Sequence, residues 1–110
     1  MEKKELQVVI SSLFDSDLAN IHNYGTLTFG IKYADQFIAD IFLSVQDLKT
    51  QYELHVECRH LRTKSKKYRN IIMGAYLIIY RITLNRVEVL RAIHGSKASA
   101  LIRTARSVKM

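Results

Sequence analysis

The chain has 110 residues, of which 48% are hydrophobic and 25% are charged. This length suits one compact core and is too short for two, and the composition excludes a disordered chain, so we expect a single domain over residues 1–110. Cys58 is the only cysteine, which excludes an internal disulfide and argues against a thiolate zinc site; a reducing, cytoplasmic setting is expected.

Positive charge is concentrated in the C-terminal half. The chain has 17 Lys and Arg against 10 Asp and Glu, a net charge of +7, and from Arg59 onward Glu88 is the only acidic residue. This asymmetry predicts a cationic surface for nucleic acid, a ribosome or an acidic protein segment. The alternative is that the charge serves solubility alone.

Neither export nor membrane insertion is expected. The charged start, residues 1–6, is not followed by an apolar stretch of signal-peptide length. The longest uncharged, mostly apolar stretch runs from Asn70 to Tyr80, well below the roughly 20 residues of a membrane-spanning helix.

The first predicted elements are a strand and a helix. The β-branched run Leu6–Ile10 predicts a strand that ends at two serines. Ser12 or Asp15 is suited to cap the helix that follows, and the region 25–30 breaks or bends it. The apolar residues at helical spacing are Phe14, Leu18, Ile21 and Tyr24.

A second, longer helix is predicted over Ala34–Tyr52. Apolar residues follow i, i+3, i+4, i+7 spacing, and charged residues lie elsewhere around the helix. An aromatic and aliphatic stripe of this kind is typical of a core, and we interpret it so in preference to a cofactor site. Its members are Ala34, Phe37, Ile38, Ile41, Phe42, Val45, Leu48 and Tyr52.

The remaining elements are a connection, three strands and a tail. Residues 54–67 show no sustained periodicity and are interpreted as a mobile connection. Residues 98–108 are expected to form a short helix or to fray. An antiparallel meander with a turn at Leu84–Asn85 is predicted between them, with strands over Tyr68–Met73, Tyr76–Ile82 and Arg86–Ile93.

That turn predicts which residues share a face of the sheet. It places Ile79 opposite Leu90 and Tyr76 opposite Ile93. One face is apolar and needs the two helices as cover, which gives an α+β fold: an N-terminal strand, a two-helix hairpin packed on an antiparallel sheet, and a short C-terminal helix or tail. The other face is mixed and expected to be partly open to a partner; it carries Leu77, Ile79, Arg81, Glu88, Leu90, Ala92 and His94.

The last two strands also carry a sequence resemblance. Residues 74–97, GAYLIIYRITLNRVEVLRAIHGSK, resemble the signature of ParE-like toxins, a G-x-Y-L-I-x-Y-R strand and a turn before V-E-V-x-R-x-x-H-G. Asp17, Leu18 and Ile21 match the D-L-x-x-I of that family's first helix. The resemblance covers about residues 8 to 99. The family that it indicates is the ParE-like branch of the RelE/ParE superfamily. It implies a plasmid-stabilisation toxin of a type II toxin–antitoxin system.

No motif for a cofactor or a metal ion is found. The sequence has no paired catalytic carboxylates, nucleophile elbow, glycine-rich phosphate loop or H-E-x-x-H motif. His55, His60 and His94 have basic flanks and lack a Cys or acidic partner at fixed spacing. No metal and no cofactor are therefore expected.

The superfamily contains two kinds of effector. RelE-like members resemble ribosome-dependent mRNA endonucleases, which need cations around the scissile phosphate and a proton-transfer group; here Arg81, His94 and Lys97 are the candidates. Against this, Leu77 stands where such enzymes have an Arg, and residues 96–103 lack a C-terminal Tyr. The ParE branch, which acts on DNA gyrase by protein contact without catalysis, is favoured. A degenerate member that only binds its antitoxin is a third alternative. For His94, the end of a strand at His94-Gly95 is the favoured interpretation over proton transfer.

Two sets of contacts are expected. Arg91 is a charged residue on the apolar face, and a buried guanidinium needs a carboxylate partner. Asp17 is the candidate, in a structural ion pair.

The antitoxin is expected to supply an acidic segment that folds on binding and covers the mixed face and the basic run. The residues expected to bind partners are Arg59, Arg62, Lys64, Lys66, Lys67, Arg69, Arg81, His94 and Lys97.

Overall fold

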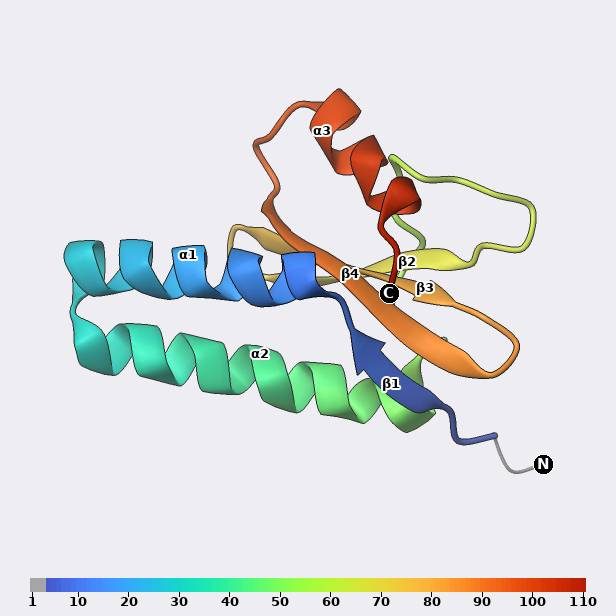
Figure 1. Ribbon diagram of the computed structural model, residues 1–110, viewed down its shortest axis with the longest axis horizontal. Coiled ribbons are helices and arrows are strands. Elements are labelled where there is room, and N and C mark those ends of the chain that lie inside the picture. Colours follow the sequence, from blue (N-terminus) through green and yellow to red (C-terminus); the bar gives the residue numbers. More distant parts are fainter. Residues whose placement is uncertain (1–3) are drawn as a thin grey trace.

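A computed structural model describes residues 4–110; residues 1–3, counted above with the charged start, lie outside the described residues. A helical hairpin covers one face of a four-stranded sheet, and a short C-terminal helix lies on the other (Figure 1). The predicted α+β class is thus confirmed. In chain order the elements are β1 (Gln7–Ile10), α1 (Ser12–Phe29), α2 (Ile31–Gln51), β2 (Tyr68–Met73), β3 (Tyr76–Ile82), β4 (Arg86–His94), α3 (Ser99–Arg103) and the 3-10 turn η1 (Thr104–Ser107).

The N-cap of helix α1 lies one residue before Ser12, the earlier of the two predicted caps. Ser11, not Ser12 or Asp15, is the N-cap: its extended backbone leads into the helix, and its Oγ accepts a hydrogen bond from the Phe14 N–H at 2.9 Å. The same hydroxyl donates to the carbonyl of Leu90 at 2.7 Å, which ties the start of α1 to β4. Asp15 lies in the first turn, where the helix dipole favours a carboxylate.

The two glycines near the end of α1 have different roles. Gly25 does not break α1; it is buried, and a Cβ there would lie 3.4 Å from the Cβ of Ala34, so its lack of a side chain lets α1 and α2 approach closely. Gly30 ends the helix with φ +98°, a conformation that side chains disfavour, and its N–H donates to Thr26 at 3.0 Å.

The sheet has the order β1-β4-β3-β2. Strands β2, β3 and β4 form the predicted antiparallel meander. The first strand joins it in parallel with β4, with Val8 paired to Val87, and the connection between these two strands consists of the helical hairpin followed by β2 and β3.

The predicted β3–β4 register is correct near the turn and wrong beyond it. Tyr80 lies opposite Val89 as predicted, but a β-bulge then leaves Leu90 without an opposed residue. Ile79 faces Arg91 instead of Leu90, and Tyr76 faces His94 instead of Ile93. The extra residue exchanges the faces of Ala92, which packs on the helix side, and Ile93, which packs on the opposite side.

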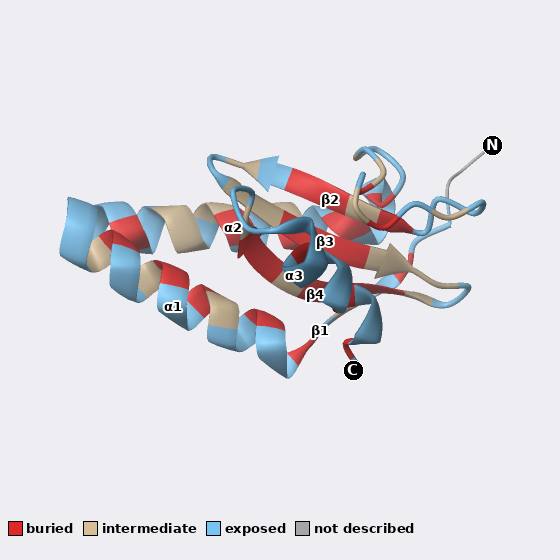
Figure 2. Cartoon of the chain, turned by 90° about the horizontal axis from the view of Figure 1, so that it is seen from above, coloured by how far each residue is buried: buried red, intermediate tan, exposed pale blue. Residues whose placement is uncertain are grey.

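Both faces of the sheet are covered, so the mixed face is not open as predicted. On the helix side, α1 and α2 pack their apolar stripes on Ile78, Tyr80, Val87 and Val89. The other face is covered by α3, η1 and the connection before β2 (Figure 2), and that connection contributes the buried residues Cys58 and Leu61. Its core consists of Cys58, Leu61, Tyr68, Ile79, Leu90, Ile93, Ile102, Ala105 and Val108.

Candidate functional site

A groove of about 750 Å³ lies between the helical hairpin and the far end of the β3–β4 pair. One wall is formed by α1 and the start of α2, and the other by the β2–β3 turn and the loop that precedes α3. Two of the lining residues, Ile21 and Ala92, belong to the main core, which places the base of the groove against that core. Its lining is mainly apolar and aromatic, a composition suited to binding a partner.

A row of aromatic rings runs along this groove. Phe29 and Tyr33 have ring centroids 4.8 Å apart, followed by Phe37 at 6.3 Å from Tyr33, Tyr76 at 5.9 Å from Phe37, and His94 at 5.3 Å from Tyr76. Phe29 and Tyr33 are 60% and 52% exposed, although large aromatic side chains are usually covered in a monomer. This row, called the aromatic row below, therefore offers apolar area to a partner.

The row ends at a polar corner. His94 Nδ1 accepts a hydrogen bond from the Ser96 N–H at 3.1 Å, which orients the imidazole ring, and the exposed Lys97 follows. Burial raises the pKa of Tyr76, and the neighbouring phenols of Tyr24 and Tyr33 raise it further. The groove is thus apolar along its length and cationic at one end.

Asp17 and Arg91, which the sequence paired, line the base of the groove. Arg91 Nε and Nη2 donate to the two Asp17 oxygens at 2.7 and 2.9 Å. Asp17 also accepts from the Ala92 N–H at 2.9 Å. The Asp17 hydrogen bond raises the pKa of Arg91, and the two side chains are 11% and 20% exposed. The pair therefore joins α1 to β4 next to the bulge.

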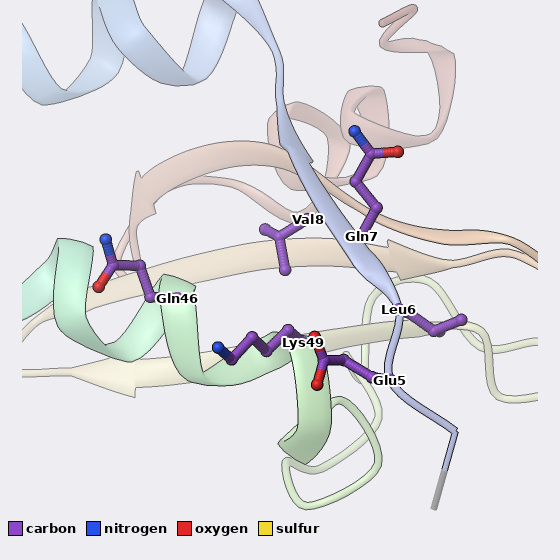
Figure 3. Close-up of a pocket in the computed structure, with 6 residues that line it drawn as sticks. All are labelled: Glu5, Leu6, Gln7, Val8, Gln46 and Lys49. Atoms are coloured by element: carbon purple, nitrogen blue, oxygen red, sulfur yellow. The ribbon is translucent and has the colours of Figure 1, made fainter.

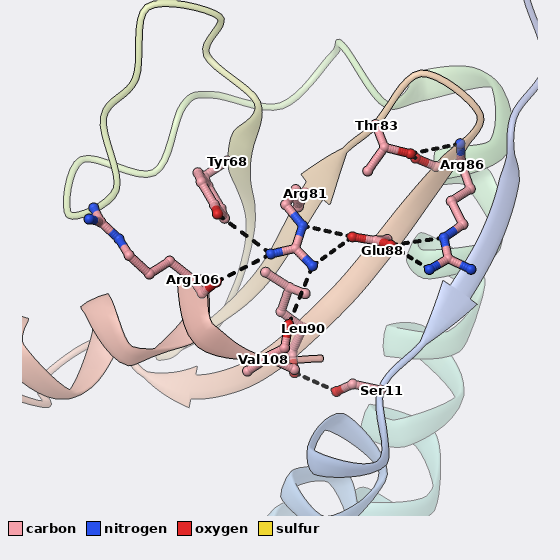
Figure 4. Close-up of polar contacts among 9 residues, drawn as sticks. All are labelled: Ser11, Tyr68, Arg81, Thr83, Arg86, Glu88, Leu90, Arg106 and Val108. Carbon is pink, nitrogen blue, oxygen red and sulfur yellow. Dashed lines mark hydrogen bonds and ion pairs between the residues drawn. The ribbon is translucent and has the colours of Figure 1, made fainter. Parts of the chain in front are cut away.

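Arg81 is engaged in a separate network on the covered face (Figure 4). Its Nε donates to Glu88 at 2.7 Å, and its other nitrogens donate to the carbonyls of Arg106 and Val108 and to the Tyr68 hydroxyl, at 3.3 to 3.5 Å. Arg86 binds the second Glu88 oxygen at 2.8 Å. Burial alone raises the pKa of Glu88, but the hydrogen bonds and charges of the two arginines outweigh it and hold the pKa below its usual value.

The predicted basic run is divided by the fold. Arg69 is engaged, because its guanidinium donates to the carbonyls of Glu53, His55 and Lys66. The other cations of the run are exposed on the loop before β2, namely Arg59, Arg62, Lys64, Lys66 and Lys67. The structure thus places the predicted partner residues at three separate locations: this loop, the groove with His94 and Lys97, and the Arg81 network.

A second depression lies where β1 meets the end of α2 (Figure 3). Leu6 and Val8 form its apolar part, and the Leu6 N–H donates to the Lys49 carbonyl at 2.8 Å. The other lining residues are Glu5, Gln7, Gln46 and Lys49, which include no histidine, cysteine or hydroxyl group. We interpret it as a packing seam.

Residues 4–110 contain neither a metal-binding cluster nor a membrane-spanning helix. Within that range, no three or more His, Cys, Asp or Glu side chains are arranged to hold a metal ion. No helix in the same range has the length and hydrophobicity to cross a membrane.

A family model described as the ParE toxin of the type II toxin–antitoxin system parDE matches residues 8–98. The chain belongs to the ParE toxin family. Its ParE fold is also similar to a solved structure described as the chromosomal ParDE TA system from P. aeruginosa, with a TM-score of 0.68 and 14% identity over 84% of this chain and 98% of that one. No curated protein matches.

In this ParE family member, sequence reasoning missed the aromatic row. Phe37 packs against the main core, as its place in the predicted stripe indicates, and so does Tyr76; both rings also line the groove. Phe29 and Tyr33 flank the Gly30 break and were given no role. The available signal was two aromatic residues on either side of a helix-ending glycine, a position where a core is not expected.

Proposed function

We propose that this ParE family toxin inhibits DNA gyrase by protein–protein contact, without catalysis, and that a cognate antitoxin holds it inactive in the cytoplasm. The observation that carries the proposal is the groove with its aromatic row. An exposed apolar surface in a groove suits recognition of a protein, whereas catalysis on RNA requires several cations gathered around one phosphate.

The arrangement of the ribonuclease candidates supports the same choice. His94 lies opposite Tyr76, which is five positions along β3 from Arg81, so the two candidates are roughly 17 Å apart along the strand. The Arg81 guanidinium is also held by Glu88 and by the C-terminal carbonyls. These groups do not converge on one scissile bond, and Leu77 provides no cation between them.

The antitoxin is the proposed occupant of the groove in the inactive complex. An amphipathic segment would place apolar side chains on the aromatic row and a carboxylate beside Lys97, which is exposed at the cationic end. This assignment replaces the mixed sheet face as the antitoxin surface, because the C-terminal segment covers that face. Binding there would block any contact of gyrase with the same groove.

Two assays on the purified toxin test the proposal. Inhibition of gyrase supercoiling is expected, together with intact mRNA in a translating extract. In cells, expression without antitoxin should arrest growth with filamentation and DNA-damage signalling. Rapid loss of full-length mRNA with normal supercoiling would show a ribonuclease instead. A harmless protein that still binds the antitoxin would be a degenerate member.

A further inference from the structure

Seven exposed cations of the C-terminal half form a basic face on the loop before β2 and on α3 with η1. Cys58 and Leu61 are fully buried against Ile102 and Ala105, which packs the loop before β2 beside α3 and η1. Residues next to these apolar anchors therefore lie at the surface on neighbouring segments. We define the basic face as Arg59, Arg62, Lys64, Lys66, Lys67, Arg103 and Arg106, all of them exposed.

Electrostatics link the two segments of this face. Burial lowers the pKa of His60, and the positive charges of Arg59 on the loop and Arg103 on α3 lower it further. One acidic side chain adjoins these charges: the half-buried Glu57, whose carboxylate accepts a hydrogen bond from the Thr63 N–H at 3.0 Å, stands against the seven cations of the face. The single acid after Arg59 is Glu88, which is 6% exposed and bound by Arg81 and Arg86. The acidic residues of the helical hairpin lie in the layer on the other side of the sheet.

The chemistry of the basic face fits phosphate groups. None of the exposed side chains in residues 59–69 and 103–109 is a large hydrophobic one. A folded or folding protein partner generally needs buried apolar anchors, whereas phosphate contacts use Lys, Arg and hydroxyl groups alone. Hydroxyls alternate with the cations here, at Thr63, Ser65, Thr104 and Ser107. No exposed aromatic ring lies among these residues, so the stacking used to hold single strands is missing from them.

We propose that the basic face binds the phosphate backbone of duplex DNA. Binding would be independent of base sequence and sensitive to salt, since each neutralised phosphate releases counterions. This property goes beyond the proposed action on gyrase and does not depend on it. If both hold, the toxin contacts gyrase and its bound DNA with different surfaces.

The test is binding of the purified toxin to a labelled duplex, measured by fluorescence anisotropy over a series of salt concentrations. Two double variants, Arg62→Gln with Lys64→Gln and Arg103→Gln with Arg106→Gln, each remove two exposed charges. Each is expected to lower the slope of log affinity against log salt by about 0.9 for every phosphate that the variant no longer neutralises. The matched control, Lys32→Gln with Lys49→Gln on α2, removes the same charge and should keep the parental slope.

Several results overturn the proposal. They are no duplex binding by the parent, an equal reduction of the slope in the control, or parental slopes in both double variants. Parental DNA binding combined with slower antitoxin association in the double variants would assign the basic face to an acidic protein. The binding assay contains no gyrase, so it is read separately from supercoiling inhibition, and thermal unfolding of each variant verifies its fold.

Discussion

The carboxylate of Asp17 on α1 accepts two hydrogen bonds from Arg91 and a third from the backbone of Ala92, at 2.7 to 2.9 Å. The contact spans 74 positions of sequence and fixes the helical hairpin to the strand just beyond the bulge. One acid thus satisfies both a guanidinium and a backbone N–H.

Replacing Arg91 by Ala should destabilise the fold. Breaking a buried pair from one side typically costs about 3 to 5 kcal/mol, and the partial exposure of this pair favours the lower end. The free energy of unfolding is measured by urea denaturation, with the exposed Lys97→Ala as control, expected within about 0.5 kcal/mol of the parent. A stable Arg91→Ala protein that has lost toxicity would make Arg91 a functional residue.

Glu88→Gln should remove a pH-dependent contribution to stability. The arginines hold the pKa of Glu88 below its usual value of 4.5, so the carboxylate stabilises the fold fully above that value and progressively less as the pH falls through the lowered pKa. The free energy of unfolding should fall by about 3 kcal/mol at pH 7, and this reduction should shrink as the pH is lowered below 4.5. Urea denaturation at several pH values measures the difference in the free energy of unfolding between the variant and the parent. A difference that stays constant down to about pH 3 would contradict the prediction.

Gly30→Ala should weaken the helical hairpin. The backbone of Gly30, with φ +98° and ψ 161°, lies in a region that is essentially restricted to glycine, and a Cβ there costs about 1 to 3 kcal/mol. No neighbouring atom lies within 4 Å of that Cβ, so the penalty is conformational and not a steric clash. The midpoint of thermal unfolding of Gly30→Ala is compared with that of Thr28→Ala, a control at an exposed position, and should be lower. Equal midpoints for the two variants would refute the strain argument.

Tyr33→Ala should loosen the complex with the antitoxin. Removing the exposed second ring of the aromatic row takes away apolar contact area, and such changes appear mainly in the dissociation rate. Surface plasmon resonance with the cognate antitoxin is expected to show faster dissociation by about tenfold or more, equivalent to about 1.4 kcal/mol. Leu43→Ala, which removes an exposed apolar side chain from α2 outside the groove lining, is the control. Identical dissociation of the Tyr33→Ala and parental proteins would move the antitoxin away from the groove.

The parts of the fold that depend on local pattern were predictable. Helical spacing identified α1 and α2, and the Leu84–Asn85 turn set the register as far as Val89. Beyond Val89 the bulge depends on contacts that are remote in sequence, such as the hydrogen bond from Ser11 to Leu90, which no local pattern reveals. The C-terminal cover was missed for a related reason: Ile102, Ala105 and Val108 are small or widely spaced apolar residues whose burial depends on a face formed by other elements.

The candidate site was less predictable than the fold. The Asp17–Arg91 contact followed from one charged residue on an apolar face, because a buried charge demands a partner. The aromatic row could not be predicted in this way. The exposure of its rings depends on how far α1 and α2 extend beyond the sheet (Figure 1), which the local sequence does not specify.

The pairing of β1 with β4 sets an order of events during synthesis. A strand that is complete at Ile10 waits for partners at residues 86–89, which a ribosome adding about 5 to 20 residues per second reaches roughly 4 to 15 s later. During that interval the nascent chain lacks Arg91, His94 and Lys97, so one side of the groove does not exist. A fragment released early from a stalled ribosome therefore presents an incomplete groove, and only nearly full-length chains are expected to engage either the antitoxin or the target.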